Sequence, residues 1–317
     1  MIDPRLAALG WKEEERDAWG ERPRDGQIPA RVVGLHRNHI VDLISAEGEL
    51  AGRPAGRMLR DRSQATAMPA VGDWVAALPD GTIQEILPRR TVLARRSAAD
   101  RDRIQVLATN VDKAIVVSSL NREHDPVRLE RMVRLAEASG ATPVIALSKA
   151  DLSDESEQLR RRVAETFPGI EVHALSSKTG EGVTGLEGSL ARGETVVLLG
   201  RSGVGKSTLA NILLGWERQK TAAVRETDDR GRHATTSREL FPLPGGALLI
   251  DTPGLRAPGS IEADDLIPGA AEAELTDQRA AEIERLAAYC RFRDCAHETE
   301  PGCAVTAAIE AGELPGR

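Results

Sequence analysis

The sequence has few cysteines, no long apolar run and no signal-peptide pattern at its start. Three cysteines in 317 residues exclude a fold held together by a disulfide framework. No apolar run approaches the roughly 18 residues that cross a membrane, and Met1–Arg5 lacks a charged stretch followed by an apolar one. We therefore expect a cytoplasmic protein without a membrane partner. We also expect it to be a monomer.

The net charge of −7 argues against a uniformly basic nucleic-acid-binding chain, but the charge is unevenly distributed. Residues 31–103 carry twelve arginines and nine acidic residues, whereas residues 261–317 carry five arginines and thirteen acidic residues. The basic segment could face a polyanion while the acidic one keeps the chain in solution. Two ordinary solvated surfaces would give the same counts, so charge alone leaves both interpretations open.

The apolar runs divide the chain into four parts, the first of which is an extension over residues 1–30. Short runs separated by turn signals in residues 31–103 predict five strands and a small β-barrel. These strands are expected at 31–35, 39–41, 71–76, 82–87 and 91–93. Apolar residues alternate around Trp74, which favours a core position over an exposed stacking platform.

Residues 104–260 alternate apolar strands with amphipathic helices, which predicts a parallel sheet with helices on both faces. The strands are expected at 114–117, 143–147, 170–172, 195–199 and 247–250. Asp125 followed by Pro126 is typical of a helix start. Residues 261–317 are predicted to be a mainly helical, Ala-rich tail, which contains all three cysteines.

A phosphate-binding loop follows the expected strand 195–199 and precedes an apolar helix. The motif G-x-x-x-x-G-K-[ST] is complete in Gly200, Arg201, Ser202, Gly203, Val204, Gly205, Lys206 and Ser207, and Thr208 continues it into the helix. Its glycines let backbone N–H groups surround a phosphate, Lys206 would reach the β- and γ-phosphates, and Ser207 would coordinate Mg²⁺. A chance Gly-rich turn is the alternative, and the flanking strand and helix argue against it.

Two further signals belong to the same predicted site. Asp251 ends an apolar strand and Gly254 follows three residues later, an arrangement in which the acid holds the Mg²⁺ shell and the glycine amide senses a γ-phosphate. The polar stretch between Glu217 and Arg238 has no apolar period and is typical of a switch loop. Thr235 in this stretch is expected to complete the Mg²⁺ shell.

Two loops that would select guanine come before the phosphate loop. Each follows an expected strand, at the sheet edge where ligands bind in open α/β sheets. The first is Ser148, Lys149, Ala150 and Asp151, and the second is Ser176, Ser177 and Lys178. Asp151 would accept hydrogen bonds from the guanine N1 and N2 groups. The order of base loops, phosphate loop and Asp251 predicts a circularly permuted GTPase.

In Ras-like enzymes a glutamine directly after the switch glycine orients the attacking water. This chain has Leu255 at that position, and a leucine side chain forms no hydrogen bond. Another group must therefore orient the attacking water, or intrinsic hydrolysis is slow. His233 is the best candidate in the switch stretch, and a histidine exposed in a flexible loop is the alternative.

The tail carries a candidate zinc site, because Cys290, Cys295, His297 and Cys303 fall within fourteen residues. Three thiolates and one imidazole make a closed tetrahedral set, which is typical of one structural Zn²⁺. A redox pair is the rival interpretation, although the spacing differs from C-x-x-C.

These motifs together resemble the RsgA (YjeQ) family of bacterial GTPases that act in small ribosomal subunit assembly. The resemblance also rests on the segments 69–75, 87–90, 105–112 and 291–295. It implies that the barrel is an OB-fold that contacts ribosomal RNA, that the subunit stimulates hydrolysis of GTP to GDP, and that His233 supports this reaction. Ser148 stands where the family usually has asparagine, and Ala234 where threonine is common.

The sequence leaves two other functions open. Leu255 also suits a nucleotide-gated RNA-binding module whose hydrolysis is incidental, and a thiolate cluster beside a switch would suit a GTP-dependent metal chaperone. A closed four-ligand site argues against metal delivery. Basic residues of the barrel are candidate phosphate contacts, namely Arg53, Arg57, Arg60, Arg62, Arg89, Arg90, Arg95 and Arg96.

Overall fold

The chain forms two compact units, residues 1–268 and 269–317, each with a core of its own. The computed structural model describes residues 3–20, 26–60, 68–96, 104–120, 125–215 and 239–251. In the second unit it describes residues 283, 286–287, 289–292, 295, 297 and 300–310. No helix within these ranges is long and apolar enough to cross a bilayer.

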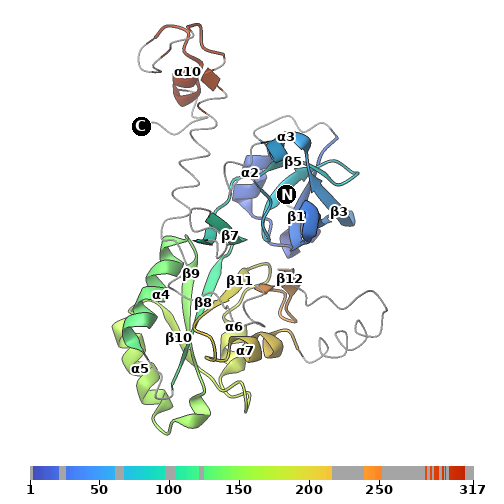
Figure 1. The fold of residues 1–317 in the computed structure, drawn as a ribbon. Coiled ribbons are helices and arrows are strands. Elements are labelled where there is room, and N and C mark those ends of the chain that lie inside the picture. The colour runs from blue at the N-terminus through green and yellow to red at the C-terminus, as the bar shows by residue number, and fades with distance from the viewer. Residues whose placement is uncertain are drawn as a thin grey trace. The chain divides into compact units, whose positions relative to one another are not determined.

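The first unit begins with a five-stranded barrel after two short helices (Figure 1). Its strands are β1 (Ile28–Leu35), β2 (Val41–Ser45), β3 (Gly48–Pro54), β4 (Trp74–Ala77) and β5 (Thr82–Ile86). The strand order β1-β2-β3-β5-β4 is closed by pairing of β1 with β4, and helix α3 (Gly56–Arg60) follows β3. The expected OB-fold barrel is confirmed.

Two of the expected barrel strands differ from the structure, and one strand of the barrel was not expected. Of the segment 39–41, His39 ends the 3-10 turn η1 (Arg37–His39), and only Val41 is in a strand, as the first residue of β2. The prediction missed β3, because most of its residues are exposed and it offers no apolar run. The expected strand at 91–93 belongs to β6 (Val92–Arg96), which pairs outside the barrel with β7 (Ile104–Thr109).

A mostly parallel sheet follows, in the order β10-β9-β8-β11-β13-β12. Its parallel strands are β8 (Lys113–Ser119), β9 (Thr142–Ser148), β10 (Glu171–Ala174), β11 (Thr195–Leu199) and β13 (Leu248–Asp251). The prediction missed β12 (Glu239–Pro242), which pairs antiparallel with β13. The α/β architecture expected from the alternating pattern is confirmed.

Helices cover both faces of this sheet. On one face α4 (Pro126–Ala138) and α5 (Ser156–Thr166) pack their apolar sides against the sheet through residues such as Leu129 and Val163. On the other face α6 (Val183–Gly188) and α7 (Lys206–Leu213) contribute Leu186 and Leu209. The predicted start of α4 is confirmed, since the Asp125 carboxylate accepts the Arg128 N–H and Pro126 occupies the first turn.

Strand β1 belongs to the barrel and to the parallel sheet at the same time. Ala30 and Val32 point into the barrel core, whereas Val33 and Leu35 pack against the core of the parallel sheet. Gly34 pairs with Glu239 of β12, so the described strands of both parts form one continuous eleven-stranded sheet. The barrel and the parallel sheet are therefore continuous through β1 and not joined only by a linker.

The N-terminal segment is folded and covers the outside of the barrel. It forms helices α1 (Pro4–Ala8) and α2 (Glu13–Gly20). Trp11 packs edge-to-face on Trp74, with 4.7 Å between the ring centroids, and Leu6 and Leu87 complete this cluster. Trp74 is fully buried, as expected, but under this segment and outside the barrel core.

Candidate nucleotide site and candidate metal site

The phosphate-loop motif connects the carboxyl end of β11 to the start of α7, as its context predicted. Gly200, Gly203 and Gly205 have φ of +154°, +83° and +104°, values that favour glycine. A Cβ at Gly200 would also lie 2.5 Å from the Val117 carbonyl oxygen. These glycines therefore allow the loop to curl back over the sheet before the helix begins.

Lys206 lies inside this loop and is almost fully buried. Its ammonium donates to the carbonyl oxygens of Gly200 and Arg201, at 2.6 and 2.7 Å. Ser207 follows in the first turn of α7 and is half-buried, while Thr208 is exposed. The buried cation and the N–H groups at the start of α7 form a positive environment that suits an anion.

The two predicted base loops are hydrogen-bonded to each other, although about 25 residues separate them. The Ser176 hydroxyl donates to the Asp151 carboxylate at 2.6 Å, and the Ala150 N–H donates to the Leu175 carbonyl at 3.1 Å. Lys149 has a φ of +60°, a conformation uncommon for a residue with a side chain. These contacts fix the orientation of the exposed Asp151 carboxylate at the edge of the sheet.

The first base loop is also tied to the phosphate loop. The Ser148 hydroxyl is buried and donates to the Val204 carbonyl at 2.6 Å. The spacing of the motifs showed that both loops lie at carboxyl ends of strands, but it did not reveal this bond. The structure therefore brings the segments 148–151, 176–178 and 200–208 together at one edge of the sheet.

The Ser177 side chain adds a detail that the sequence did not indicate. Its hydroxyl oxygen is buried and has no hydrogen-bond partner in the part of the chain that the structure describes. A buried polar atom without a partner is costly unless a ligand or water satisfies it. The second base loop therefore carries a free hydroxyl group, suited to a polar ligand.

Several predicted site residues lie outside the described part of the chain. These are His233, Thr235 and Gly254, and also Leu255. Asp251 is the last residue of β13, and its side chain is likewise not described. Because β13 runs parallel to β11, Asp251 lies at the same edge of the sheet as the phosphate loop.

The cysteine-rich segment of the second unit forms a candidate metal site. The side-chain ligand atoms of Cys290, Cys295, His297 and Cys303 all lie within 4.8 Å of one another. The Sγ atoms of Cys290 and Cys303 are 3.9 Å apart, and they lie 3.6 and 3.5 Å from His297 Nδ1. Tetrahedral Zn–S bonds of 2.3 Å would place two sulfurs about 3.8 Å apart, so this donor set fits Zn²⁺.

The surroundings of Cys303 favour the thiolate form that a metal needs. The Thr306 N–H donates to Cys303 Sγ at 3.3 Å, and the proximity of Thr306 lowers the pKa of Cys303 to about 6. Helix α10 (Ala304–Glu310) begins directly after Cys303 and supplies Val305 and Ala308 to the small core of this unit. A metal held here would join the 290–303 loop to α10.

Two of the candidate RNA-contacting arginines have structural roles. Arg89 is buried and forms a two-pronged ion pair with Asp73, at 2.7 and 2.6 Å. Arg90 bonds Glu15 and Asp112 at 2.7 and 2.9 Å. Periodicity shows neither contact, because each joins segments far apart in the sequence. Arg53 and Arg57 remain exposed on the barrel.

Comparison with known proteins identifies the family. The model of the family described as RsgA GTPase matches residues 86–261. A relative from Streptomyces coelicolor, named small ribosomal subunit biogenesis GTPase RsgA, is 43% identical, covering 98% of this chain and 83% of its own length. A protein of the same name from Opitutus terrae is 42% identical, covering 98% and 85%. The chain belongs to the RsgA GTPase family. It is therefore a P-loop GTPase.

Solved structures agree with the RsgA assignment. YjeQ from Thermotoga maritima is 25% identical and has a TM-score of 0.55, covering 91% of this chain and 93% of its own. YloQ, described as a circularly permuted GTPase, is 23% identical and has a TM-score of 0.51, covering 93% and 92%. Each of these two structures covers more than nine tenths of this chain, so they share its fold.

Proposed function

We propose that this RsgA-family GTPase binds the small ribosomal subunit and its rRNA during late maturation and hydrolyses GTP to GDP with stimulation by the subunit. The names of the relatives from Streptomyces coelicolor and Opitutus terrae support the subunit as partner. One structural observation supports the nucleotide-binding part of the proposal. Three separate segments meet through the Ser148–Val204 and Asp151–Ser176 bonds.

In this proposal each segment binds one part of the nucleotide. Asp151 accepts the guanine N1 and N2 hydrogens, because the Ser176 hydroxyl holds its carboxylate in place. The unpaired Ser177 hydroxyl faces a polar group of the base. Lys206 exchanges bonds to loop carbonyls for bonds to phosphate oxygens. The remaining positions of the three segments, among them Lys149, contact the nucleotide mainly through backbone groups.

Mg²⁺ bound with GTP would be held by Ser207, Thr235 and Asp251. It would neutralise charge that develops on the phosphates. His233 is proposed to orient the attacking water, since Leu255 offers no hydrogen bond. His233→Ala should then keep GDP affinity and lose GTP turnover. Unchanged turnover would remove His233 from this role.

The barrel is proposed as the rRNA contact, through its exposed arginines. Arg53 lies on β3 and Arg57 on α3, while Arg89 and Arg90 are committed to buried ion pairs. Phosphate contacts of this kind weaken steeply with salt. A protein working on the small subunit in this way acts in the bacterial cytoplasm.

The tail is proposed to hold one structural Zn²⁺ through its three cysteines and His297. A closed set of four ligands retains its metal and organises a unit with a small core. Reversible transfer of zinc to an apo-acceptor protein would instead favour a metal chaperone.

The deciding experiment is GTP turnover by the purified protein, alone and with purified small ribosomal subunits. ATP serves as the control nucleotide. Strong, GTP-selective stimulation would support both the base loops and the ribosomal partner. Nucleotide-dependent subunit binding without stimulation would favour a gated RNA-binding module. If neither turnover nor binding responds to the subunit, the proposed function is wrong.

A further inference from the structure

Arg31 is a fully buried cation at the junction of the barrel and the GTPase sheet. It lies on β1, and its guanidinium donates to the carbonyl oxygens of Leu9, Gly72 and Asn110 and to the Thr195 hydroxyl. These four acceptors come from the N-terminal segment, the barrel, the β7–β8 connection and the first residue of β11. One side chain therefore joins four parts of the chain.

Burying this charged guanidinium costs free energy, so apolar packing alone does not explain why an arginine lies here. Burial lowers the pKa of Arg31 to about 10, although nearby carboxylates of Asp112 and Glu15 oppose the effect. The guanidinium carbon also lies 5.4 Å from the centroid of the Trp74 ring. Arginine suits the place because its planar group offers five N–H donors in fixed directions.

Thr195 connects these contacts to the GTPase sheet, and its hydroxyl, N–H and carbonyl groups all form hydrogen bonds. Its hydroxyl accepts from Arg31 at 2.8 Å, its N–H donates to the Asp112 carboxylate at 2.8 Å, and its carbonyl accepts from the Asp112 N–H at 2.7 Å. Thr195 begins β11, a fully buried strand of five residues. Gly200 of the phosphate loop follows directly.

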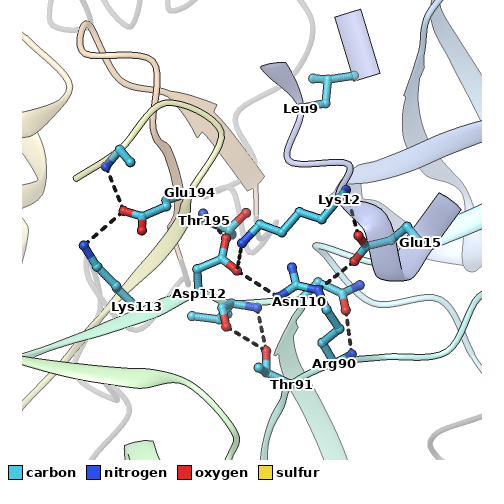
Figure 2. A network of polar contacts seen from close by, with 12 residues as sticks. Leu9, Lys12, Glu15, Arg90, Thr91, Asn110, Asp112, Lys113, Glu194 and Thr195 are labelled. Atoms are coloured by element: carbon cyan, nitrogen blue, oxygen red, sulfur yellow. Dashed lines mark hydrogen bonds and ion pairs between the residues drawn. The ribbon is translucent and has the colours of Figure 1, made fainter. Parts of the chain in front are cut away.

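The N-terminal segment reaches the same residue by a second route (Figure 2). Lys12 and Arg90 both bind the Asp112 carboxylate, at 2.6 and 2.9 Å, and Arg90 also binds Glu15 at 2.7 Å. Figure 2 shows these side chains converging on Asp112 beside Thr195. The segment is therefore linked to the start of β11 through Arg31 and through Asp112.

Backbone contact reinforces this link. A Cβ on Gly193, two residues before β11, would lie 2.7 Å from the Ala7 carbonyl oxygen, and one on Gly10 would lie 2.8 Å from the Gly193 carbonyl oxygen. Both glycines have positive φ, of +78° and +87°. The turn between α1 and α2 thus lies directly against the turn that leads into β11.

We propose that Arg31 and Thr195 are positioning residues that couple the barrel and the N-terminal segment to the phosphate loop through β11. Nucleotide in the loop then orders β1 and residues 3–20, and by reciprocity an RNA that orders the barrel raises nucleotide affinity. This inference rests on the nucleotide site of the proposed function. It requires no direct contact between RNA and nucleotide.

Hydrogen exchange of the full-length protein, with and without GDP, tests the coupling. Thr195→Val removes the hydroxyl that bonds Arg31 and keeps the backbone bonds to Asp112, while Thr195→Ser retains the hydroxyl. The matched control is Thr109→Val. Thr109 is equally buried and bonds Asp73 and Val71 at the same junction, but it lies on β7.

GDP should slow exchange at the amides of residues 200–208 in every variant. In the wild type, Thr195→Ser and Thr109→Val it should also slow exchange across β1, by at least about 5-fold. Thr195→Val should lose this second effect. Equal protection of β1 in Thr195→Val, or none in the wild type, would overturn the coupling. Absence of protection at 200–208 would instead refute the nucleotide site and the coupling with it.

A second measurement separates coupling from simple loss of stability. Thr195→Val and Thr109→Val should lower the melting temperature by similar amounts, because each removes a buried hydroxyl group. Only Thr195→Val should reduce the stimulation of GTP turnover by small ribosomal subunits, while basal turnover stays unchanged. Equal stimulation in the two variants would contradict a positioning role for Thr195.

Discussion

The bond between Ser148 and the Val204 carbonyl gives a sharp test of the nucleotide site. Ser148 ends β9 and Val204 lies in the phosphate loop, 56 residues further along the chain, yet their oxygen atoms are 2.6 Å apart. The substitution Ser148→Ala removes this donor, together with a longer 3.4 Å contact to the Ser118 carbonyl oxygen, and leaves the backbone bonds of the buried residue in place. The phosphate loop then loses its bond to the base loop.

The size of the effect follows from the burial of both partners. Ser148 is 1% exposed and Val204 7%, so water cannot easily replace the lost donor. A buried carbonyl group left without a hydrogen-bond donor costs about 1 to 2 kcal/mol of free energy, which is a factor of about 5 to 30 in an equilibrium constant. In the free protein the loop would sample other conformations, and GDP would have to order it again. We therefore expect the GDP dissociation constant to rise about 5- to 30-fold.

The assay is displacement of a fluorescent GDP analogue, accompanied by thermal unfolding. Ser139→Ala is the matched control, because the Ser139 hydroxyl is also buried and donates to the Ala136 carbonyl at 2.7 Å, at the end of α4. Both variants should lower the melting temperature by about 2 to 8 °C. Only Ser148→Ala should weaken the binding of GDP. Equal GDP affinity in the two variants would show that the bond does not order the phosphate loop.

Three other predictions concern the barrel junction and the metal site. Asp73→Ala removes the carboxylate that pairs with the buried Arg89 cation, so the free energy of unfolding should fall by about 3 to 5 kcal/mol in urea titrations. The double variant Asp73→Leu/Arg89→Met should lose less, and an equal loss would contradict the argument. Burial raises the pKa of Asp112, but its hydrogen bonds and neighbouring cations outweigh burial and lower the pKa below the usual value of 3.8. The ionised Asp112 carboxylate therefore stabilises the fold fully above the usual pKa, and this stabilisation is lost as the pH falls through the lowered pKa. The stability gap between wild type and Asp112→Asn should therefore shrink below about pH 4 in acid-unfolding curves, and a constant gap would refute this. Cys303→Ser should lose bound zinc in elemental analysis of the purified protein, and one retained Zn²⁺ per chain would exclude Cys303 as a ligand.

Local patterns were enough to predict most of the fold. The strands of the parallel sheet are continuous apolar runs, so periodicity located all five of them to within a few residues. Asp125 and Pro126 marked the start of α4 because capping depends only on neighbours in the chain. The antiparallel strand β12 was missed because it has only four residues, one of which is buried.

Features that depend on distant contacts could not be predicted. The sequence does not distinguish three arginines, Arg31, Arg89 and Arg90, from other basic residues. Only the fold shows that carboxylates and carbonyl groups surround them. The N-terminal segment matched no motif, yet Trp11 covers Trp74 across 63 positions. The candidate site followed the opposite pattern. Its motifs are local and were visible in the sequence, whereas the bonds that join them were not.

The shared strand β1 has a consequence for synthesis on the ribosome. The chain emerges from its N-terminus, so β1 is made early, while its partner Glu239 in β12 lies about two hundred residues later. Until then Val33, which packs against the core of the parallel sheet, lacks most of that core, while Leu35 can already pack against the barrel core. Such long-range pairing forms slowly and leaves apolar surface open to association. The nascent barrel of this GTPase should therefore need protection, by a chaperone or by the ribosome surface, until the last strands of the sheet have been made.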